Sequence, residues 1–207
     1  MPEFAQLLDG YRRFRTANYQ RYRERWQSLS HGQHPPVMII ACCDSRVDPA
    51  TIFDTLPGQA FVVRNVANLV PPYDLQGGLH GVSSAIEFGV TGLDVRHIVV
   101  MGHGACGGIR AALEGGDLGL DGKSFLDQWL ALVSDVRETV LADPTVTDKQ
   151  RGLELAAIHQ SLANLRTFPF VAEAEAAAKL KLHGCHFAIE DGAMSVLDEA
   201  EGCFRPV

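Results

Sequence analysis

The sequence predicts an α/β fold, in which a mostly parallel central β-sheet is flanked by helices, with an N-terminal helical arm and a C-terminal helical region plus an edge strand. Short continuous apolar runs occur at 37–42, 60–64 and 96–101, each bounded by Gly, Pro, Asp or Asn. Such runs are typical of strands buried on both faces. A helical pattern lies between the second run and the third, and strands that alternate with helices favour a parallel sheet with right-handed crossovers.

The first 29 residues predict one or two amphipathic helices. Apolar residues recur at helical spacing from Phe4 to Phe14, and six arginines lie between positions 12 and 25. Because the whole chain carries a formal net charge of −7, a general attraction to nucleic acid or to an anionic membrane is not expected. We therefore interpret the basic run as a solvated or subunit-facing surface.

The second half of the chain is expected to be mostly helical. Residues 123–180 carry helical patterns, and residues 181–198 resemble a last strand and a hairpin. At 207 residues the chain fits one domain, 1–207. Within it we expect an N-terminal helical arm (1–32), an α/β core that carries the candidate site (33–115), and C-terminal helices with the last strand (116–207).

The composition is that of an ordinary globular protein, so the function is expected to depend on specific sites rather than on overall charge or hydrophobicity. Hydrophobic residues make up 46% of the chain and charged residues 21%. The first residues lack the apolar stretch of a secretion signal, and no run is long enough for a membrane span, so a soluble cytoplasmic protein is expected. The five unevenly spaced cysteines favour thiols, metal ligands or a nucleophile over a disulfide framework.

The segment ACCDSRVDP, residues 41–49, raises the question of which cysteine is chemically active. Side chains alternate along an extended segment, so Cys42, Asp44 and Arg46 share one side while Cys43 faces the other. Cys42 also ends the first predicted strand, and open α/β sheets place their ligand crevices at the carboxyl ends of strands. Cys42 is therefore the predicted active cysteine.

A second candidate group follows the third predicted strand in the segment MGHGACGGI. His103 and Cys106 lie in this glycine-rich exit, where the backbone N–H groups of the next helix can approach an anion or a thiolate. Together with Cys42 they offer two thiolates and one imidazole. Three protein ligands with an open fourth position are typical of a catalytic zinc site, whereas structural zinc sites usually have four.

These segments resemble the β-class carbonic anhydrases. The resemblance rests on C-x-D-S-R at 42–46 and H-x-x-C at 103–106, and it extends through PGQAFVVRNVANLVPPYD, AIEF, IVVMGHGACGGI and LHG, covering most of residues 33–190. It implies one Zn²⁺ per chain bound by Cys42, His103 and Cys106, and reversible hydration of carbon dioxide to bicarbonate and a proton. It also implies a catalytic pair, Asp44 and Arg46, in which Arg46 keeps Asp44 ionised and off the metal while Asp44 orients a zinc-bound hydroxide.

The resemblance assigns the remaining pocket as well. The substrate-binding residues it implies are Gln33, Phe61, Val66, Leu79, Gly102 and Gly107, with Leu79 where plant-like members carry a tyrosine. Family members complete each pocket across a dimer interface, so a homo-oligomer is expected, either a dimer or a dimer of dimers, with no nucleic-acid or membrane partner. His80 is a candidate proton shuttle, although a hydrogen-bonded structural histidine is an equal alternative.

One feature of some family members is not expected here. Their inhibitory bicarbonate site uses a tryptophan and a glycine where this chain has Ile39 and Ala41, together with an arginine that matches Arg64. The sequence therefore resembles the constitutively open, plant-like subtype.

Other functions remain as alternatives at this point. A hydrolase of carbonyl sulfide or carbon disulfide could use the same scaffold, and a non-catalytic zinc or bicarbonate-binding module is possible in principle, although binding alone does not need the Asp44–Arg46 pair. A cysteine phosphatase is disfavoured because its loop requires Cys-x₅-Arg, and Arg46 follows Cys42 by four residues. Redox chemistry would depend on a strained disulfide between the adjacent Cys42 and Cys43.

Overall fold

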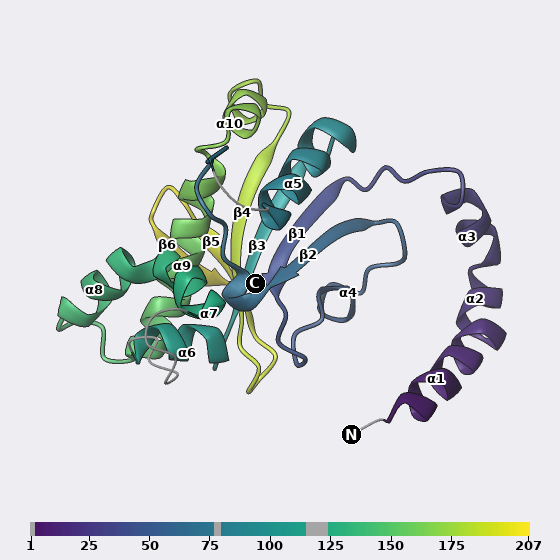
Figure 1. Cartoon of the computed structure of the whole chain (residues 1–207), viewed down its shortest axis with the longest axis horizontal. Coiled ribbons are helices and arrows are strands. Elements are labelled where there is room, and N and C mark those ends of the chain that lie inside the picture. Colours follow the sequence, from purple (N-terminus) through teal and green to yellow (C-terminus); the bar gives the residue numbers. More distant parts are fainter. Residues whose placement is uncertain (1–2, 77–79, 115–123) are drawn as a thin grey trace.

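The computed structural model describes residues 3–76, 80–114 and 124–207, and it shows the predicted α/β architecture (Figure 1). One six-stranded sheet has the order β2-β1-β3-β4-β5-β6. Its first four strands are parallel, and β5 and β6 are added antiparallel at one edge. The strands are β1 (Val37–Cys42), β2 (Ala60–Asn65), β3 (His97–His103), β4 (Lys181–Phe187), β5 (Met194–Asp198) and β6 (Cys203–Pro206).

The central strands are buried on both faces, as their continuous apolar sequences predict. In β1, Met38 and Ile40 belong to one core cluster, while Ile39 and Ala41 belong to another. Alternate residues of a strand point to opposite faces, so the two clusters account for both sides of β1. Helix α9 (Lys149–Leu165) packs against β3 and β4 and contributes to both clusters.

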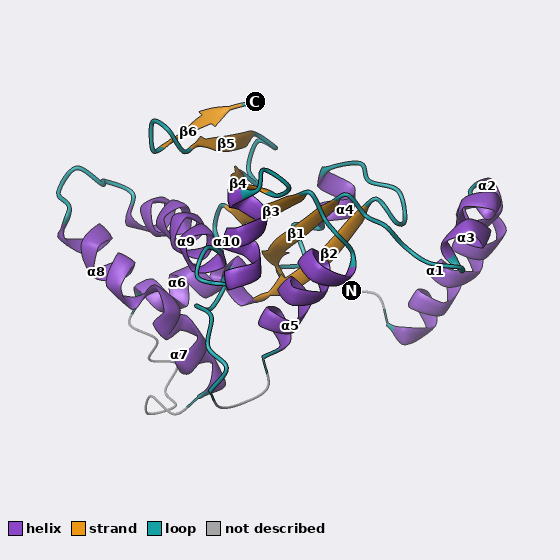
Figure 2. Cartoon of the chain, turned by 90° about the horizontal axis from the view of Figure 1, so that it is seen from above, coloured by secondary structure: helices purple, strands orange, loops and turns teal. Residues whose placement is uncertain are grey.

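Most helices lie beside the sheet or at the carboxyl ends of its strands (Figure 2). The expected helix after the second strand is present as α5 (Gly81–Glu87), followed by a π-helical segment, η2 (Phe88–Gly92). The remaining helical elements outside the N-terminal arm are α4 (Pro49–Ile52), η1 (Val66–Asn68), α6 (Gly107–Leu113), α7 (Phe125–Leu130), η3 (Ala131–Val133), α8 (Ser134–Ala142) and α10 (Pro169–Ala176).

The chain termini differ in detail from the sequence-based expectation. The arm forms three helical segments rather than one or two: α1 (Phe4–Thr16), α2 (Asn18–Arg21) and α3 (Arg23–Leu29), with breaks at Ala17 and Tyr22. At the other end, β4 and β5 form the expected strand and hairpin, but β4 is an interior strand and β6 adds an unexpected sixth strand. Short edge strands with a proline, such as β6, give a weak sequence signal.

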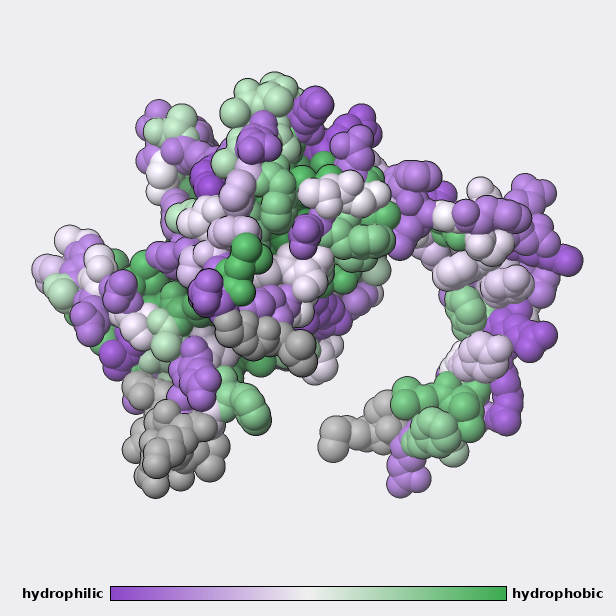
Figure 3. All heavy atoms as spheres, turned by 45° about the horizontal axis from the view of Figure 1, so that its top comes forward, coloured by the Kyte–Doolittle hydropathy of each residue, from purple (hydrophilic) through white to green (hydrophobic). Residues whose placement is uncertain are grey.

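The arm reaches away from the sheet, and α1 carries no buried residue (Figures 1 and 3). Its exposed apolar side chains are Phe4, Leu7, Leu8 and Tyr11. Within the described ranges, none of the helices combines the length and apolar character that crossing a membrane requires.

Candidate metal centre and active site

Cys42, His103 and Cys106 converge at the carboxyl edge of the sheet. Cys42 is the last residue of β1, His103 is the last residue of β3, and Cys106 immediately precedes α6. Their candidate ligand atoms all lie within 4.8 Å of one another, and the two sulfur atoms are 3.9 Å apart. All three side chains are buried, whereas Cys43 is exposed. The structure thus brings together the three residues that the sequence predicted as ligands, and Cys43 is not among them.

The imidazole of His103 is oriented for ligation through one nitrogen. Its Nδ1 lies 2.9 Å from the carbonyl oxygen of Gly104, which suits an Nδ1–H donor. This leaves the Nε2 lone pair free, and that buried Nε2 has no hydrogen-bond partner among the described residues. A coordinating histidine usually donates a hydrogen bond from its other ring N–H to a carbonyl or carboxylate oxygen, as His103 does here.

The two thiols also fit a divalent cation. The hydrogen bond with Cys106 lowers the pKa of Cys42 to about 4 against the opposing effect of burial, with further help from His103 and from the backbone N–H groups of Asp44 and Ala67. The same interaction and burial raise the pKa of Cys106. Without a cation the site thus holds one thiolate readily but not two. A doubly charged soft metal such as zinc would allow both sulfurs to ionise.

Asp44 and Arg46 form a bidentate pair beside these ligands. Arg46 Nε donates to Asp44 Oδ1 over 2.9 Å, and Nη2 donates to Oδ2 over 2.7 Å. These hydrogen bonds hold the pKa of Asp44 well below its usual range. Asp44 Oδ2 is 4.0 Å from His103 Nε2, and Arg46 also donates to the carbonyl oxygen of Ala105. The pair is therefore anchored on both segments that supply the ligands.

Arg64 holds the loop after β1 from the neighbouring strand. Its guanidinium donates to the carbonyl oxygens of Cys42 at 2.9 Å, Asp44 at 2.7 Å and Val47 at 3.4 Å. It also lies 3.5 Å from a carboxylate oxygen of Asp48. The donors of Arg64 are consequently committed to the backbone that carries Cys42 and Asp44.

Three of the predicted pocket residues, Val66, Gly102 and Gly107, lie near the ligand group. Val66 packs on the start of α6, where a Cβ on Gly108 would approach its Cγ1 to 2.7 Å. Gly107 follows Cys106 directly and faces open space. Gly102 has a packing role, because a side chain there would collide with Ile158 at 2.7 Å.

The other predicted pocket residues lie elsewhere or cannot be placed. Phe61 pairs with Met38 in the sheet, four residues before Cys42, which is about 13 Å along the strand. Gln33 precedes β1 and lines a separate pocket beside Trp26 and Gly58. Leu79 lies outside the described residues. Within one chain, Gln33 and Phe61 are therefore not brought to the cysteines.

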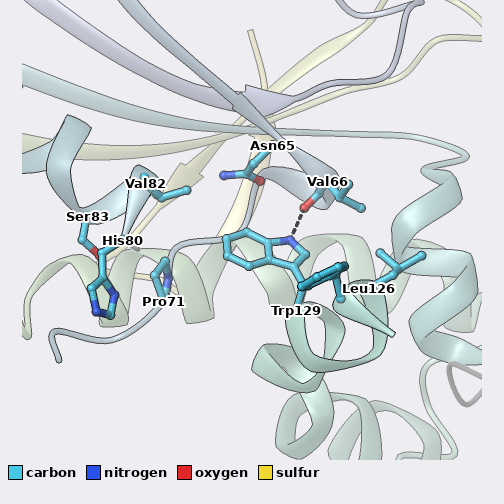
Figure 4. A pocket seen from close by; sticks show the side chains of 10 residues that line it. Asn65, Val66, Pro71, His80, Val82, Ser83, Leu126 and Trp129 are labelled. Carbon is cyan, nitrogen blue, oxygen red and sulfur yellow. Dashed lines mark hydrogen bonds between the residues drawn. The ribbon is translucent and has the colours of Figure 1, made fainter. Parts of the chain in front are cut away.

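Val66 also forms part of a large apolar groove, with a volume of about 760 Å³ (Figure 4). The Trp129 indole crosses the groove and donates to the carbonyl oxygen of Val66 over 2.8 Å. His80, the candidate shuttle, lies at the opposite end of the groove beside Ser83.

Sequence reasoning missed several residues that support the site. Glu154 and Gln150 from α9 bond the main chain of Cys106, and His186 from β4 bonds Glu154. The only sequence signal for Gln150 and Glu154 was their spacing as a polar pair at i and i+4 inside an otherwise buried helix face.

The same chemistry is found in known proteins. The family model described as carbonic anhydrase matches residues 37–194. Beta carbonic anhydrase 3 of Arabidopsis thaliana is 34% identical over 194 residues, covering 92% of this chain and 75% of that protein. The chain belongs to the β-class carbonic anhydrases. The structure of the β-carbonic anhydrase CcaA superposes with a TM-score of 0.91 at 31% identity, covering 98% of this chain and 91% of the other.

A further β-carbonic anhydrase structure is relevant to assembly. One of two tetrameric enzymes from Sordaria macrospora superposes with a TM-score of 0.81 at 30% identity, covering 98% of each chain. As a β-class carbonic anhydrase, the protein is a carbonate dehydratase that uses zinc, and Cys42, His103 and Cys106 form the group that could hold the ion. This outcome confirms the family resemblance, the enzyme class and the cofactor that the sequence predicted.

Proposed function

We propose that this protein catalyses the reversible hydration of carbon dioxide at the Cys42–His103–Cys106 group, with Asp44 and Arg46 as its catalytic pair. The observation that carries the proposal is the bidentate Arg46–Asp44 pair beside three buried candidate ligands, with Asp44 Oδ2 4.0 Å from His103 Nε2. When bound, zinc supplies a hydroxide nucleophile near neutral pH by lowering the pKa of a coordinated water. Carbon dioxide has no charge to bind, so the remaining task is to orient that nucleophile.

Asp44 is suited to this orientation because an ionised carboxylate only accepts hydrogen bonds. A hydroxide beside Asp44 would donate a hydrogen bond to the carboxylate through its one O–H group, which would leave a lone pair facing the carbon. Since the pKa of Asp44 is held low by Arg46, the carboxylate is ionised at neutral and at mildly acidic pH. The stabilisation from this pair is present above the usual carboxyl pKa and is lost as the pH falls through the lowered value.

Arg46 has a second effect, which is to restrain Asp44. Both carboxylate oxygens accept from its guanidinium, so neither is free to turn toward the ligand group 4.0 Å away. A carboxylate in the fourth position would close the site. The pair therefore serves both to orient the nucleophile and to keep the position open.

Hydration should be measured together with hydrolysis of carbonyl sulfide, which a hydroxide nucleophile can also attack. We expect the purified protein to release protons rapidly from dissolved carbon dioxide in a stopped-flow indicator assay, with much slower consumption of carbonyl sulfide. The reverse preference would favour the hydrolase, and inactivity toward both substrates despite bound zinc would favour a binding module.

We further propose that the active unit is at least a homodimer. Gln33 and Phe61 are distant from Cys42 in their own chain, so any contribution they make to a pocket would be to that of a neighbour. The arm supports the same proposal, since α1 projects from the body with Phe4, Leu7, Leu8 and Tyr11 exposed on one helical face (Figure 3). Such unpartnered apolar surface favours association with a second copy.

The dimer can be tested by breaking the apolar face of the arm. Wild type is expected to sediment as a dimer or a larger species at assay concentration, and Leu7→Glu with Tyr11→Glu should yield monomers with most of the hydration activity lost. Arg13→Ala is the control, because Arg13 lies on the opposite face of α1 and its replacement should change neither property. A fully active monomer would refute an obligate dimer.

Bicarbonate is not expected to inhibit this enzyme cooperatively. Ile39 and Ala41 replace the tryptophan and glycine of the inhibitory site, and the donors of Arg64 are directed to the carbonyl groups of the β1 loop. Hydration rates measured across pH at several bicarbonate concentrations should change smoothly in the slightly alkaline range. A steep loss below about pH 8 that deepens with bicarbonate and involves more than one proton would show that a closed state exists.

A further inference from the structure

A buried polar cluster lies against the main chain of Cys106. Glu154 and His186 are 3% and 1% exposed, and Glu154 Oε2 is 3.1 Å from His186 Nε2. Burying a carboxylate costs several kcal/mol unless hydrogen bonds compensate for the lost water. Glu154 belongs to α9 and His186 to β4, so the pair joins the long helix to the strand beside β3.

The hydrogen bonds of this cluster converge on the main chain of Cys106. Glu154 Oε1 accepts from the Cys106 N–H over 3.0 Å, and Gln150 Nε2 donates to the Cys106 carbonyl oxygen over 3.0 Å. Gln150 Nε2 also donates to Glu154 Oε1 over 2.8 Å. The peptide groups on both sides of Cys106 are thus held by two side chains one helical turn apart.

The position of Cys106 needs such support because its local sequence does not fix it. Ala105 adopts a φ of +54°, a conformation that alanine rarely takes, and Gly107 follows with open space around it. An unfavourable backbone conformation persists only where the surrounding structure holds it, so keeping the Cys106 sulfur 3.9 Å from Cys42 Sγ needs restraint from outside this segment. The hydrogen bonds from Glu154 and Gln150 of α9 supply this restraint.

We propose that Glu154, aligned by His186 and assisted by Gln150, is a positioning residue that holds the third ligand in place and thereby slows the loss of zinc. The inference rests on the proposed function of the Cys42–His103–Cys106 group. Residues that orient metal ligands typically contribute a factor of about 10 to 100 in metal affinity or activity. The effect should appear as faster zinc release, beyond any change that a less stable fold would cause.

The test compares zinc release from wild type and three variants, using a chromophoric chelator in excess. Glu154→Leu removes the acceptor of the Cys106 N–H and should release zinc about 10 to 100 times faster than wild type. Glu154→Gln retains an acceptor oxygen and should stay within a few-fold of wild type. Asn164→Leu is the matched control: Asn164 is buried on the same helix and donates to the carbonyl oxygen of Val70, so its loss should destabilise the fold without changing zinc release.

Each outcome decides a separate point. If Glu154→Leu releases zinc at the wild-type rate, or no faster than Asn164→Leu, the positioning role is wrong. If Glu154→Leu does not fold, Gln150→Leu replaces it, and release at least several-fold faster than wild type is required for the proposal to stand. If wild type binds no zinc, the proposed function itself is wrong, and the variants no longer test the positioning role separately.

Discussion

Purified Cys42→Ser protein is expected to contain almost no zinc and to be inactive, whereas Cys43→Ser should retain about one zinc per chain and most of its activity. Serine keeps the size of the side chain but offers a hydroxyl that does not ionise near neutral pH. Cys42 is buried within ligand distance of His103 and Cys106, while Cys43 is exposed and its N–H serves a strand hydrogen bond to Asn65.

The two adjacent cysteines make this comparison a closely matched one. Both variants carry the same chemical change one residue apart. Effects of expression, of handling and of losing one thiol are therefore the same in both, and a difference in zinc content reflects the position alone. Metal analysis after dialysis against a weak chelator gives the readout. Equal zinc loss from both proteins would show that the side-chain alternation along this segment does not select the ligand.

Asp44→Asn should keep zinc and the fold but lose roughly a hundredfold or more of hydration activity. Asparagine is nearly isosteric with aspartate, yet its amide can donate as well as accept and carries no charge to pair with Arg46. The nucleophile would then be bound without a fixed orientation. Wild-type activity in this variant would rule out the orienting role.

Arg46→Ala should also abolish hydration while leaving zinc in place, but for a different reason. It frees both oxygens of Asp44, which the guanidinium holds at 2.7 and 2.9 Å, and allows the carboxylate to turn toward the ligand group. Arg205→Ala is the control, since it removes an exposed arginine–aspartate pair with Asp198 far along the sequence. Near-normal activity in Arg46→Ala, with a structure in which Asp44 has not moved, would contradict the restraining role.

The predictable parts of the site are those set by strand geometry. Alternation along an extended segment selected Cys42, and the rule that parallel strands end at one edge brought it to His103 and Cys106. Both depend only on local sequence and on the fold class. The Asp44–Arg46 contact was expected from the same alternation, but the structure forms it in a turn after β1, where the Val47 N–H donates to the Asp44 carbonyl oxygen and the Arg46 N–H donates to Asp44 Oδ1.

Contacts between distant elements were not accessible in this way. Glu154 follows Cys106 by 48 residues, and its bond to the Cys106 N–H depends on how α9 is rotated against β3 and β4. The positive φ of Ala67, whose backbone N–H lowers the pKa of Cys42, was likewise not accessible, since glycine is the residue that a sequence would favour at such a conformation. β4 is an interior strand because β5 pairs with its outer side, and β6, whose sequence signal was too short to detect, extends the sheet beyond β5.

The central claim is that one zinc ion, held by Cys42, His103 and Cys106, makes this chain a catalyst of carbon dioxide hydration. Titrating zinc into metal-free protein while measuring stopped-flow hydration tests it most directly. The account predicts negligible activity without metal and a linear rise that ends sharply at about one zinc per chain. Full hydration activity in the metal-free protein, or activity that stays absent once one zinc per chain is bound, would contradict it.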